Sequence, residues 1–466
     1  MAREVYDVAV IGSGPGGEVA AIRAAQLGLK TVCIEKDATL GGTCLNVGCI
    51  PSKALLQSTE YYSLMNHEAK DHGLLIKELA YDFSKMQERK CQIVQSLGNG
   101  IAGLFKRNQV VHRKGIAKFV SPNVITISDG NNINEIEARS FILATGSEPI
   151  SLPFLPFDEK RVISSTGALR LEAPPKKMIV IGAGVIGVEL ASVYNRLGTE
   201  VTIVEMLDHI CPSNDAAVSK LLLQILKKQG IAFHLSAKVT GGKVEKDKVS
   251  ITVELEGKPQ QFNGDVALVA VGRRPYSQGL GMAEIGISVT TKGFVSVDGF
   301  FRSNIPHIYA IGDLIEGPML AHRASEEGIA VAEIIAGQSP HINYMAIPNV
   351  IYTHPEVAAL GFSEQEAVKK GVKVKTGVCY FKANARARCL GYTEGMVKVI
   401  GEEKTGRLIG MHIIGPHASE LIAEGVIAID RRSTLEDIVR ASHAHPTLAE
   451  AIQEACLIAL GRPIHS

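Results

Sequence analysis

Apolar residues in this chain gather into short runs that alternate with stretches rich in small residues. Residues 5–11 form the first such run, broken only by Tyr6 and Asp7, and its length favours a strand buried within a sheet. Residues 12–28 follow as G-S-G-P-G-G-E-V-A-A-I-R-A-A-Q-L-G, a pattern typical of a helix whose alanines pack closely on a sheet and which ends at Gly28. Residues 30–34 are expected to form a second strand, which ends at Glu35. The pattern predicts a strand, a helix and a second strand in that order.

The same unit recurs later in the chain, over residues 178–205. Each copy carries a G-x-G-x-x-G motif between strand and helix, and the offset from Gly12 to Glu35 equals the offset from Gly182 to Glu205. Such glycines form a tight turn, let the backbone approach a pyrophosphate and bring the helix close to the sheet, while the acid binds ribose hydroxyls. One glycine motif is a weak signal, but two at equal offsets predict two dinucleotide sites. Their residues are Gly12, Gly14, Gly17 and Glu35 in the first copy and Gly182, Gly184, Gly187 and Glu205 in the second.

Two cysteines, Cys44 and Cys49, lie shortly after the first motif, in the segment G-G-T-C-L-N-V-G-C-I-P-S-K of residues 41–53. In a regular helix, residues five positions apart have Cα atoms about 8–9 Å apart, beyond the reach of a disulfide. A bridge between them therefore needs a distorted turn, which Gly48 permits. Pro51 has a φ angle suited to the first turn of a continuing helix. The segment indicates a redox-active dithiol at the head of a helix.

Two other interpretations of this cysteine pair start from simpler chemistry. Two reduced cysteines packed as small hydrophobic residues are the usual outcome for a random pair at this spacing. A structural zinc site needs four ligands, commonly with C-x2-C spacing, and neither is present locally. The adjoining nucleotide motif favours the redox pair over both, because an electron carrier can then lie beside the sulfurs. We expect no metal site.

Length and composition limit the fold and the partners. A chain of 466 residues is too long for one compact core, so we expect several domains. The net charge is +1, Trp is absent and aromatic residues make up 5%, which argues against a nucleic-acid surface built on phosphate contacts and base stacking. No apolar run reaches the roughly 18 residues of a membrane span, so no membrane association is expected.

The spacing of the cysteines and the first residues of the sequence indicate the cellular compartment. The first residues run directly into an apolar strand, which leaves no room for a signal or transit segment. The eight cysteines do not show the spacing of a small secreted domain, and in a reducing compartment a persistent bridge is more often catalytic than structural. We therefore expect a cytoplasmic protein.

The segment of residues 41–53 resembles the active-site segment of the flavin-dependent disulfide oxidoreductases, a family that includes glutathione reductase and mercuric reductase. The resemblance covers essentially the whole chain. It implies an α/β fold with two Rossmann-like dinucleotide-binding domains plus a C-terminal α+β dimerisation domain, and hence a homodimer. The implied domains are an FAD-binding domain with the redox disulfide at 1–147, an NAD-binding domain at 148–275, a central domain completing the FAD site at 276–345 and an interface domain at 346–466.

Outside the motifs, the pattern predicts further helices and a sheet. Residues near 60–105 carry apolar side chains at three- and four-residue spacing and are expected to be helical. Alternating strands are expected near 374–381 and 396–400, and helices around 418–429 and 448–460. This C-terminal part matches the interface domain of the family.

Two dinucleotide sites in one chain suggest two different dinucleotides, and the dithiol indicates that they are a flavin and a nicotinamide. The copy beside the cysteines is assigned to FAD and the later copy to the nicotinamide. Glu205 would accept from both ribose hydroxyls and repel a 2′-phosphate, and the residues after it, M-L-D-H-I, offer no arginine to hold one. NAD is therefore expected rather than NADP.

The resemblance also assigns cofactor contacts that the residues alone do not show. A-T-G-S at residues 144–147 and A-V-G-R-R-P at 270–275 resemble the crossovers out of the two nucleotide domains. Asp313 is implied to meet the ribityl chain of the flavin, Ala321 to place backbone near its ring, and Lys53 to lie beside its reactive nitrogen. The implied FAD contacts are Thr43, Cys44, Lys53, Gly115, Ala117, Thr145, Gly146, Ser147, Asp313, Met319, Leu320, Ala321 and His322, and the further NAD contacts are Val239 and Gly272.

An acid–base pair is expected near the C-terminus, where residues 443–450 read H-A-H-P-T-L-A-E. A lone histidine is usually a surface or satisfied core residue, but thiol exchange requires proton movement, and imidazole with a pKa of about 6.5 is suited to it. Pro446 prevents an ordinary helical relation, so Glu450 could approach from the following helix and orient the ring of His445. In the family this His-Pro-x-x-x-Glu pattern supplies the base, which is implied to reach the disulfide of the other subunit. His443 lacks the adjoining proline and fits less well.

Within the family, the residues favour the branch that oxidises protein-bound dihydrolipoyl groups with NAD⁺. Glutathione reductase prefers NADPH, which Glu205 disfavours, and mercuric reductase needs a terminal cysteine pair where this chain has only Cys456. The implied partners are lipoyl domains and the acyltransferase core of a 2-oxo acid dehydrogenase complex, and the sequence does not say which complex. In the implied reaction a lipoyl thiolate, deprotonated by His445, attacks Cys44, and Cys49 passes electrons to the flavin.

A protein of a different class, a flavin-containing redox sensor or scaffold subunit, would carry the dithiol without turnover. Such a sensor should lack either the base pair or the nicotinamide site. Both are present in this sequence, so an enzyme is favoured.

Overall fold

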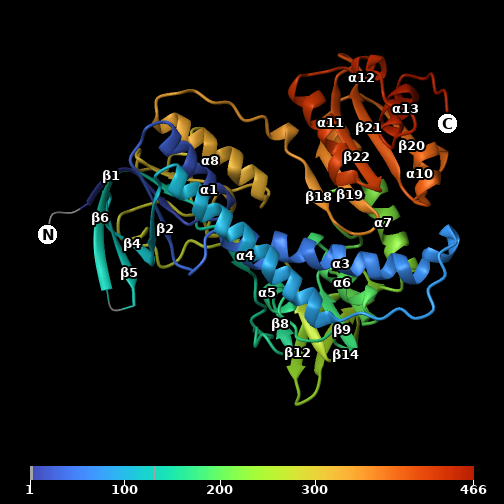
Figure 1. The fold of residues 1–466 in the computed structure, drawn as a ribbon, viewed down its shortest axis with the longest axis horizontal. Helices are drawn as coiled ribbons and strands as arrows, with labels where there is room; N and C mark the ends of the chain where they lie inside the picture. The colour runs from blue at the N-terminus through green and yellow to red at the C-terminus, as the bar shows by residue number, and fades with distance from the viewer. Residues whose placement is uncertain (1–3, 131, 466) are drawn as a thin grey trace. The chain divides into compact units, whose positions relative to one another are not determined.

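The computed structural model describes residues 4–130 and 132–465 of the chain. The described residues fall into two compact units. The first unit contains the residues up to Leu55, Asp82–Ile150 and Gly272–Ile342; the second contains Leu56–Tyr81, Ser151–Val271 and the residues from Asn343 onward. Each unit is therefore assembled from separate stretches of chain, which Figure 1 traces by colour.

A mixed seven-stranded sheet forms the centre of the first unit. Its strands are β1 (Glu4–Ile11), β2 (Thr31–Glu35), β3 (Val111–Lys114), β4 (Ile116–Ser121), β5 (Val124–Asp129), β6 (Asn132–Leu143) and β17 (Ile308–Ala310). The strand order is β3-β2-β1-β6-β5-β4, and β17 also pairs with β6. The pairs β1–β2, β1–β6, β2–β3 and β17–β6 are parallel, while β4, β5 and β6 form an antiparallel ribbon. Every residue of β2 is buried, including the polar Thr31 and Glu35 at its two ends.

Two helices, α1 (Pro15–Gln26) and α8 (Ala321–Ile335), lie side by side in the first unit (Figure 1). Small residues allow this close approach, because a Cβ added at Gly328 would lie 2.4 Å from the backbone oxygen of Gly16. Ala20, Ala21 and Ala24 of α1 belong to the buried core, as their spacing predicts, and Ala25 is partly buried against it. Gly28, just beyond α1, has a φ of +84° and ends the helix where the sequence places its end.

The expectation that residues 60–105 are helical throughout is wrong in part, because a loop divides them. The elements there are α3 (Cys49–His67), the short helix η1 (Ala69–His72) and α4 (Phe83–Arg107). Gly73, with a φ of +74°, ends η1. Asp82 begins the next helix by accepting a hydrogen bond from the backbone N–H of Lys85. Gly73 and Asp82 thus place a helix end and a helix start within residues 60–105, where the apolar spacing alone predicts a continuous helix.

A second sheet, in the second unit, repeats the parallel part of the first. Its strands are β8 (Val162–Ile163), β9 (Lys177–Ile181), β10 (Glu200–Val204), β11 (Ala232–His234) and β15 (Val266–Val269). The order is β11-β10-β9-β15-β8, and every pair is parallel. β9, β10 and β11 therefore correspond to β1, β2 and β3, and α6 (Val185–Arg196) follows β9 as α1 follows β1. The predicted repeat is confirmed as two Rossmann-like sheets.

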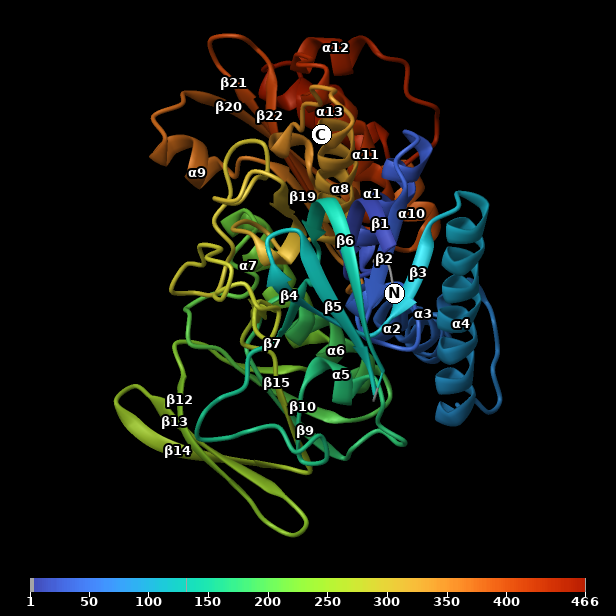
Figure 2. The same cartoon turned by 90° about the vertical axis from the view of Figure 1, so that its left-hand side faces the viewer.

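Smaller elements complete these two Rossmann-like regions. The first unit adds α2 (Gly42–Val47), β7 (Ser147–Pro149), β16 (Arg273–Pro275) and η2 (Gly312–Leu314). The second unit adds α5 (Ser165–Ala168), α7 (Ala216–Lys228), β12 (Lys238–Val244), β13 (Val249–Leu255) and β14 (Lys258–Gly264). Figure 2 shows β12, β13 and β14 as a long antiparallel ribbon.

An antiparallel five-stranded sheet carries the C-terminal part of the second unit. Its strands are β18 (Asn349–Ile351), β19 (Glu356–Gly361), β20 (Val374–Tyr380), β21 (Met396–Glu402) and β22 (Leu408–Gly415), in the order β18-β19-β22-β21-β20. The helices around it are η3 (Tyr344–Ala346), α9 (Glu364–Lys369), η4 (Phe381–Ala383), α10 (Ala385–Leu390), α11 (Ala418–Asp430), α12 (Leu435–Arg440) and α13 (Glu450–Ala459). Buried side chains such as Phe381, Met411 and Ile452 join the sheet, α11 and α13 in one core. The strands and helices expected here are confirmed, with ends shifted by one or two residues.

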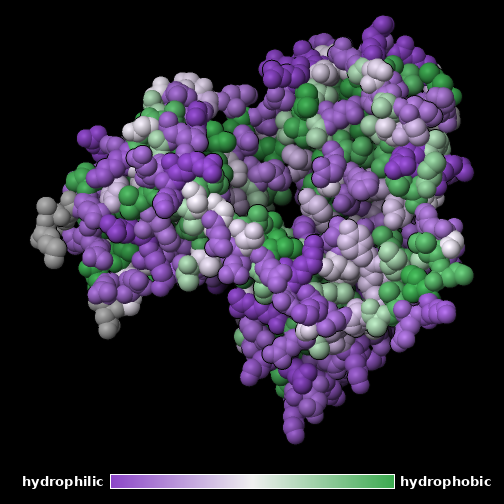
Figure 3. All heavy atoms as spheres, in the orientation of Figure 1, coloured by the Kyte–Doolittle hydropathy of each residue, from purple (hydrophilic) through white to green (hydrophobic). Residues whose placement is uncertain are grey.

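The fold class expected from the sequence is confirmed as two Rossmann-like domains plus a C-terminal α+β domain. The four domain boundaries expected from the sequence stay a prediction. Figure 3 shows hydrophilic and hydrophobic residues intermixed on the face in view. Among the helices that the structure describes, none combines the length and the apolar character that a membrane span requires.

Candidate active site

The first glycine motif forms a tight loop between β1 and α1. Gly12 has a φ of +102°, and a Cβ there would lie 2.4 Å from the backbone oxygen of Ala144. A Cβ at Gly17 would lie 2.0 Å from the backbone oxygen of Gly12, so both positions require glycine. Gly14 differs, because the space around its missing Cβ is open to 4 Å. Open space at a helix N-terminus is the arrangement that admits a pyrophosphate.

The second glycine motif repeats these contacts between β9 and α6. Gly182 has a φ of +104°, and a Cβ there would lie 2.5 Å from the backbone oxygen of Ala270. A Cβ at Gly187 would lie 2.1 Å from the backbone oxygen of Gly182, whereas the space at Gly184 is open. Each motif thus packs through its first and third glycines and leaves the second free for the approach of a ligand. Both loops fit a dinucleotide.

The acids at the strand ends, Glu35 and Glu205, also hold equivalent positions. Glu35 accepts hydrogen bonds from the backbone N–H of Ser13 at 2.9 Å and from its hydroxyl at 2.6 Å. Glu205 accepts from the backbone N–H of Ala183 at 2.6 Å. Each carboxylate also accepts from the N–H two residues further along, at 3.0 and 2.8 Å. Each acid therefore fixes its own glycine loop and lies at the strand end where the sequence predicts a ribose contact.

Cys44 and Cys49 lie on two different helices. Cys44 belongs to α2 and Cys49 begins α3, and both cysteines are in the thiol form. Gly48 between them has a φ of −138° and a ψ of −110°, which breaks the helix. A Cβ at Gly48 would lie 2.9 Å from the backbone oxygen of Thr43 and 3.3 Å from the Cα of Cys44. Gly48 is thus needed for the close approach of two backbone segments, rather than for a left-handed φ.

The environment of the dithiol raises the pKa of Cys44. The hydrogen bond with the Cys49 side chain contributes most, burial adds to it, and the nearby Lys53 ammonium acts in the opposite direction. Two thiols in contact titrate as a unit, so the negative charge left by one proton opposes loss of the other. Lys53 lies one helical turn after Cys49 on α3 and therefore on the same face. The structure brings the three predicted residues together.

Ser147 and Asp313, both implied FAD contacts, meet in the first unit. The Ser147 hydroxyl donates to the Asp313 carboxylate at 2.5 Å. Arg273 binds the same serine, through Nε to the hydroxyl oxygen at 2.7 Å and through a terminal N–H to the backbone oxygen at 2.6 Å. Burial lowers the pKa of Arg273, and Asp313 acts in the opposite direction. The sequence does not single out Arg273, because its partner lies 126 positions away.

Three further implied FAD contacts are fixed by backbone hydrogen bonds. The Thr145 hydroxyl donates to the backbone oxygen of Tyr276 at 2.7 Å, and the Tyr276 N–H donates to the oxygen of Gly146 at 2.8 Å. Gly115, with a φ of +144°, donates its N–H to the backbone oxygen of Glu35 at 2.8 Å. Gly115 therefore lies beside the acid of the first motif.

The remaining implied FAD contacts are Thr43, which lies in α2 beside Cys44, and residues in β4 and at the start of α8. Ala117 is buried, while residues 319–322 run from half-buried to exposed. The turn before them is held by a buried ion pair, in which Arg323 donates to Glu327 at 2.8 Å. Glu327 also accepts from the backbone N–H of Gly312 at 2.7 Å. This pair fixes η2, and with it Asp313, against α8.

The two implied NAD contacts outside the glycine motif, Val239 and Gly272, lie in different units. Val239 lies in β12 and pairs with Val253 next to a bulge. Two residues before Val239, the Ala237 N–H donates to the backbone oxygen of Glu205 at 2.8 Å. Val239 therefore follows a segment bound to the end of β10. Gly272, with a φ of +124°, belongs to the first unit, unlike the other implied NAD contacts.

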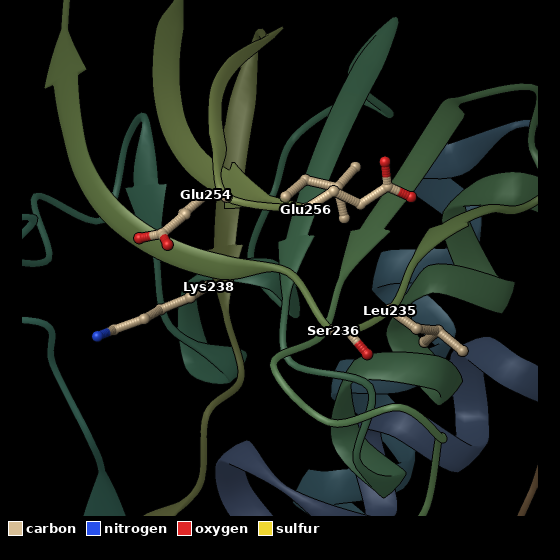
Figure 4. Close-up of a pocket in the computed structure, with 7 residues that line it drawn as sticks. Leu235, Ser236, Lys238, Glu254 and Glu256 are labelled. Carbon is tan, nitrogen blue, oxygen red and sulfur yellow. The ribbon is translucent and has the colours of Figure 1, made fainter.

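A surface pocket of about 480 Å³ adjoins Val239 in sequence. Its lining residues are Leu235, Ser236, Lys238, Glu254, Leu255, Glu256 and Gly257. Lys238 and Glu254 point to one side and Glu256 to the other (Figure 4). The polar groups do not converge, so the pocket defines no ligand. Within residues 4–130 and 132–465, no group of three His, Cys, Asp or Glu side chains could hold a metal ion.

His445 and Glu450 form the pair that their spacing predicts. Nδ1 of His445 lies 2.8 Å from Oε1 of Glu450, and the Thr447 N–H donates to the other carboxylate oxygen at 2.7 Å. Burial alone would raise the pKa of Glu450, but these two hydrogen bonds outweigh it, so the pKa is lowered. The carboxylate is therefore anionic near neutral pH and holds a proton on Nδ1, which leaves Nε2 to accept one.

His443, which the sequence disfavours as the base, has a different partner. Its Nε2 lies 3.0 Å from Oε1 of Glu424 on α11. Its side chain is 7% exposed, against 73% for His445. The sequence carries no local signal for this contact, because the two residues are 19 positions apart.

Comparison with known proteins relates the whole chain to one family. The pyridine nucleotide-disulphide oxidoreductase model matches residues 6–328, and the dimerisation domain of that family matches 347–456. The mitochondrial dihydrolipoyl dehydrogenase of Schizosaccharomyces pombe is 49% identical over 99% of this chain and 91% of its own length. The human protein of the same name is 48% identical over 97% of this chain and 90% of its own length. The structure of LpdA from Mycobacterium tuberculosis superposes with a TM-score of 0.90 at 26% identity, over 97% of this chain and 99% of that chain.

Proposed function

Because this chain belongs to the pyridine nucleotide-disulphide oxidoreductase family, we propose that it oxidises protein-bound dihydrolipoyl groups and reduces NAD⁺. The reaction is the one performed by dihydrolipoyl dehydrogenases, the name carried by its full-length relatives. The observation that carries the proposal is the Cys44–Cys49 pair at the head of α3, in a chain that also holds the His445–Glu450 pair. A dithiol and a base are what exchange with a substrate dithiol requires.

His445 starts the reaction by removing a proton from a lipoyl thiol. Its Nε2 is the free ring position, because Nδ1 faces Glu450. The exposed ring can reach a substrate, and the anionic Glu450 stabilises the imidazolium that forms. The product of this step is a lipoyl thiolate, which is the nucleophile in disulfide exchange.

The cysteine pair takes two electrons from the substrate. In the oxidised enzyme a disulfide joins Cys44 and Cys49. The lipoyl thiolate forms a bond to the Cys44 sulfur, the bond between the cysteines breaks, and Cys49 leaves as a thiolate. The second lipoyl sulfur then attacks the mixed disulfide, and the Cys44 sulfur leaves with a proton. One proton remains on His445, and the lipoyl group is released as its disulfide.

The nucleotide loops hold the electron carriers of the family. When bound, FAD supplies a two-electron relay between the Cys49 side of the pair and NAD⁺. The open positions at Gly14 and Gly184 would receive the two pyrophosphates, and the strand-end acids would accept hydrogen bonds from the ribose hydroxyls. Lys53 offers a positive charge beside the pair, which stabilises the Cys49 thiolate.

A homodimer is supported by the matched dimerisation domain. We propose that His445 of one protomer serves the cysteine pair of the other. Mixed dimers of a C44S chain and an H445Q chain test this directly, since each homodimer should be inactive. If the site is shared between protomers, the mixed dimer contains one intact site and recovers activity. If each protomer uses its own His445, the mixed dimer stays inactive.

The wider partners are lipoyl domains and the acyltransferase core of a 2-oxo acid dehydrogenase complex. The support for these partners is the substrate class proposed above, because protein-bound lipoyl groups are carried on such domains. Co-sedimentation of the purified dimer with a lipoyl-domain protein tests the partnership. A cytoplasmic location is a separate proposal, and cell fractionation with an antibody against this chain tests it.

The assay that separates the proposed reaction from its relatives compares substrates. The FAD-loaded protein should reduce NAD⁺ with dihydrolipoamide and show little activity with NADPH and either glutathione disulfide or mercuric ion. Glutathione reductase and mercuric reductase are the alternatives, and preference for either of their substrates would replace the proposal. The protein should also be yellow and bleach with dihydrolipoamide until NAD⁺ is added.

A further inference from the structure

Two histidines on one loop of the second unit have opposite environments. His443 points inward, with 7% of its side chain exposed, while 73% of the His445 side chain is exposed. Nε2 of His443 lies 3.0 Å from Oε1 of Glu424, and its Nδ1 lies 3.0 Å from the backbone oxygen of Ala441. The buried histidine is therefore bound at both ring nitrogens, whereas the exposed one is bound to Glu450 through Nδ1.

The contacts of His443 connect the loop to a helix. Nε2 faces a carboxylate oxygen and Nδ1 faces a carbonyl oxygen, and both of these oxygens are hydrogen-bond acceptors. Glu424 lies on α11, and Ala441 lies at the end of α12 where the loop begins. The ring thus joins the start of the loop to α11, and the bond to the carboxylate is of the stronger, charge-assisted kind.

Other hydrogen bonds hold the loop after His445. The Thr447 hydroxyl donates to the backbone oxygen of Ala444 at 2.7 Å, and the Asn384 side chain donates to the oxygen of Thr447 at 2.9 Å. At the start of the loop, before His445, the side-chain amide of Gln453 donates to the backbone oxygen of Ala441 at 3.3 Å. The segment before His445 therefore depends on the ring of its neighbour for its contact with α11.

We propose that His443 and Glu424 position the loop so that His445 is presented in the orientation that thiol deprotonation needs. This inference rests on the proposed function, in which His445 is the base. Glu450 orients the ring of His445 through Nδ1, and the backbone of the loop sets where that ring lies. A shift of about 1 Å in a catalytic group can cost about 100-fold in rate. His443 is thus a positioning residue, and it touches neither substrate nor cofactor.

The two bonds of His443 can be removed one at a time. In H443Q the amide nitrogen takes the place of Nε2 and keeps the bond to Glu424. In H443N the amide nitrogen takes the place of Nδ1 and keeps only the bond to Ala441. We expect H443N and E424A to lower kcat with dihydrolipoamide roughly 10- to 100-fold, while H443Q retains most of it. The double variant H443N/E424A should be no slower than either single variant, because both remove the same bond.

A second activity separates positioning from general damage. Reduction of ferricyanide by NADH uses the flavin and nicotinamide sites but needs no thiol exchange, so it should be unchanged in every variant. The pH profile of kcat/KM with dihydrolipoamide should also shift in H443N and stay in place in H443Q. H341A, which replaces an exposed histidine of the first unit, is the matched control.

Three outcomes would overturn the inference. The positioning role is wrong if H443N keeps full turnover, if H443Q is as slow as H443N, or if the ferricyanide activity falls in parallel. H445Q separates this failure from that of the proposed function. If H445Q is slow and H443N is fast, only the positioning role of His443 is wrong. If H445Q is fast, His445 is not the base, and both the proposed function and the positioning role are wrong.

Discussion

Nδ1 of His445 lies 2.8 Å from Oε1 of Glu450, and the ring that this contact orients is 73% exposed. The carboxylate is held in turn by the N–H of Thr447. A base that is open to solvent on one side and fixed on the other can accept a proton from a large, protein-bound substrate. The geometry therefore suits a dithiol carried on another protein.

The charge of Glu450 should be essential to that base. E450Q keeps an acceptor for Nδ1 but removes the negative charge that stabilises the imidazolium, so kcat with dihydrolipoamide should fall roughly 10- to 100-fold. Because the pKa of Glu450 is lowered, the wild-type enzyme keeps this carboxylate ionised to a pH below the usual range of a glutamate. Steady-state rates between pH 5 and 8, where this carboxylate stays ionised, compare E450Q with the wild-type enzyme. E420Q, at an exposed residue of α11, is the control, and equal rates in E450Q and wild type would contradict the role.

The turn between the cysteines should not tolerate a side chain. The Cβ of G48A would lie 2.9 Å from the backbone oxygen of Thr43 and 3.3 Å from the Cα of Cys44. Relief of that contact should separate α2 from α3, lower dihydrolipoamide turnover and cost about 1–3 kcal/mol of unfolding free energy. G100A, on α4 with open space around its Cβ, is the control and should be neutral or slightly stabilising. Wild-type turnover in G48A would show that the close approach is unimportant.

Glu205 should set the preference between the two nicotinamide cofactors. E205Q keeps a group that can bind the N–H of Ala183 but removes the charge that repels a 2′-phosphate. We expect the ratio of kcat/KM for NAD⁺ over NADP⁺ to fall about tenfold or more, which corresponds to about 1.4 kcal/mol. E200Q, at an exposed position of β10, is the control. An unchanged ratio would place the discrimination elsewhere.

His412 should make the protein less stable at acid pH. It is 2% exposed, burial lowers its pKa below the ordinary 6.5, and its Nε2 lies 3.0 Å from the backbone oxygen of Phe362. The unfolded chain then takes up a proton near pH 6.5 that the folded chain does not, so unfolding free energy falls as the pH drops below 6.5. The fall is at most about 1.4 kcal/mol per pH unit for one group.

H412Q keeps an N–H for Phe362 and has no titration in this range, so its stability should change less between pH 7 and 5.5. Urea unfolding at the two pH values measures the difference. H341Q, at an exposed histidine, should behave as wild type. An equal pH dependence in H412Q and wild type would show that His412 does not titrate separately from its surroundings.

Features that lie close together in sequence were predictable. The two glycine motifs each lie within one strand, turn and helix, so their spacing predicts their geometry, including the acids Glu35 and Glu205. The His445–Glu450 pair is likewise only five positions apart. Local chemistry also explains Gly28, whose positive φ ends α1.

Features that depend on distant parts of the chain were not predictable. Arg273 binds Ser147 across 126 positions, and His443 binds Glu424 across 19, so neither leaves a pattern in the sequence. The resemblance to a family supplied most of the FAD contacts, because a Gly-Asp step such as the one at Asp313 is otherwise only a turn. The need for Gly48 was predicted for its flexibility, whereas the structure shows that close backbone packing requires it.

The central claim is that reducing equivalents pass from a dihydrolipoyl group through Cys44 and Cys49 to NAD⁺. Differential alkylation with mass spectrometry measures this directly on the oxidised, FAD-loaded protein. Addition of dihydrolipoamide without NAD⁺ should expose two new thiols per chain, at Cys44 and Cys49, and addition of NAD⁺ should remove both again. Thiols that appear at other cysteines, or a labelling pattern that neither reagent changes, would contradict the account.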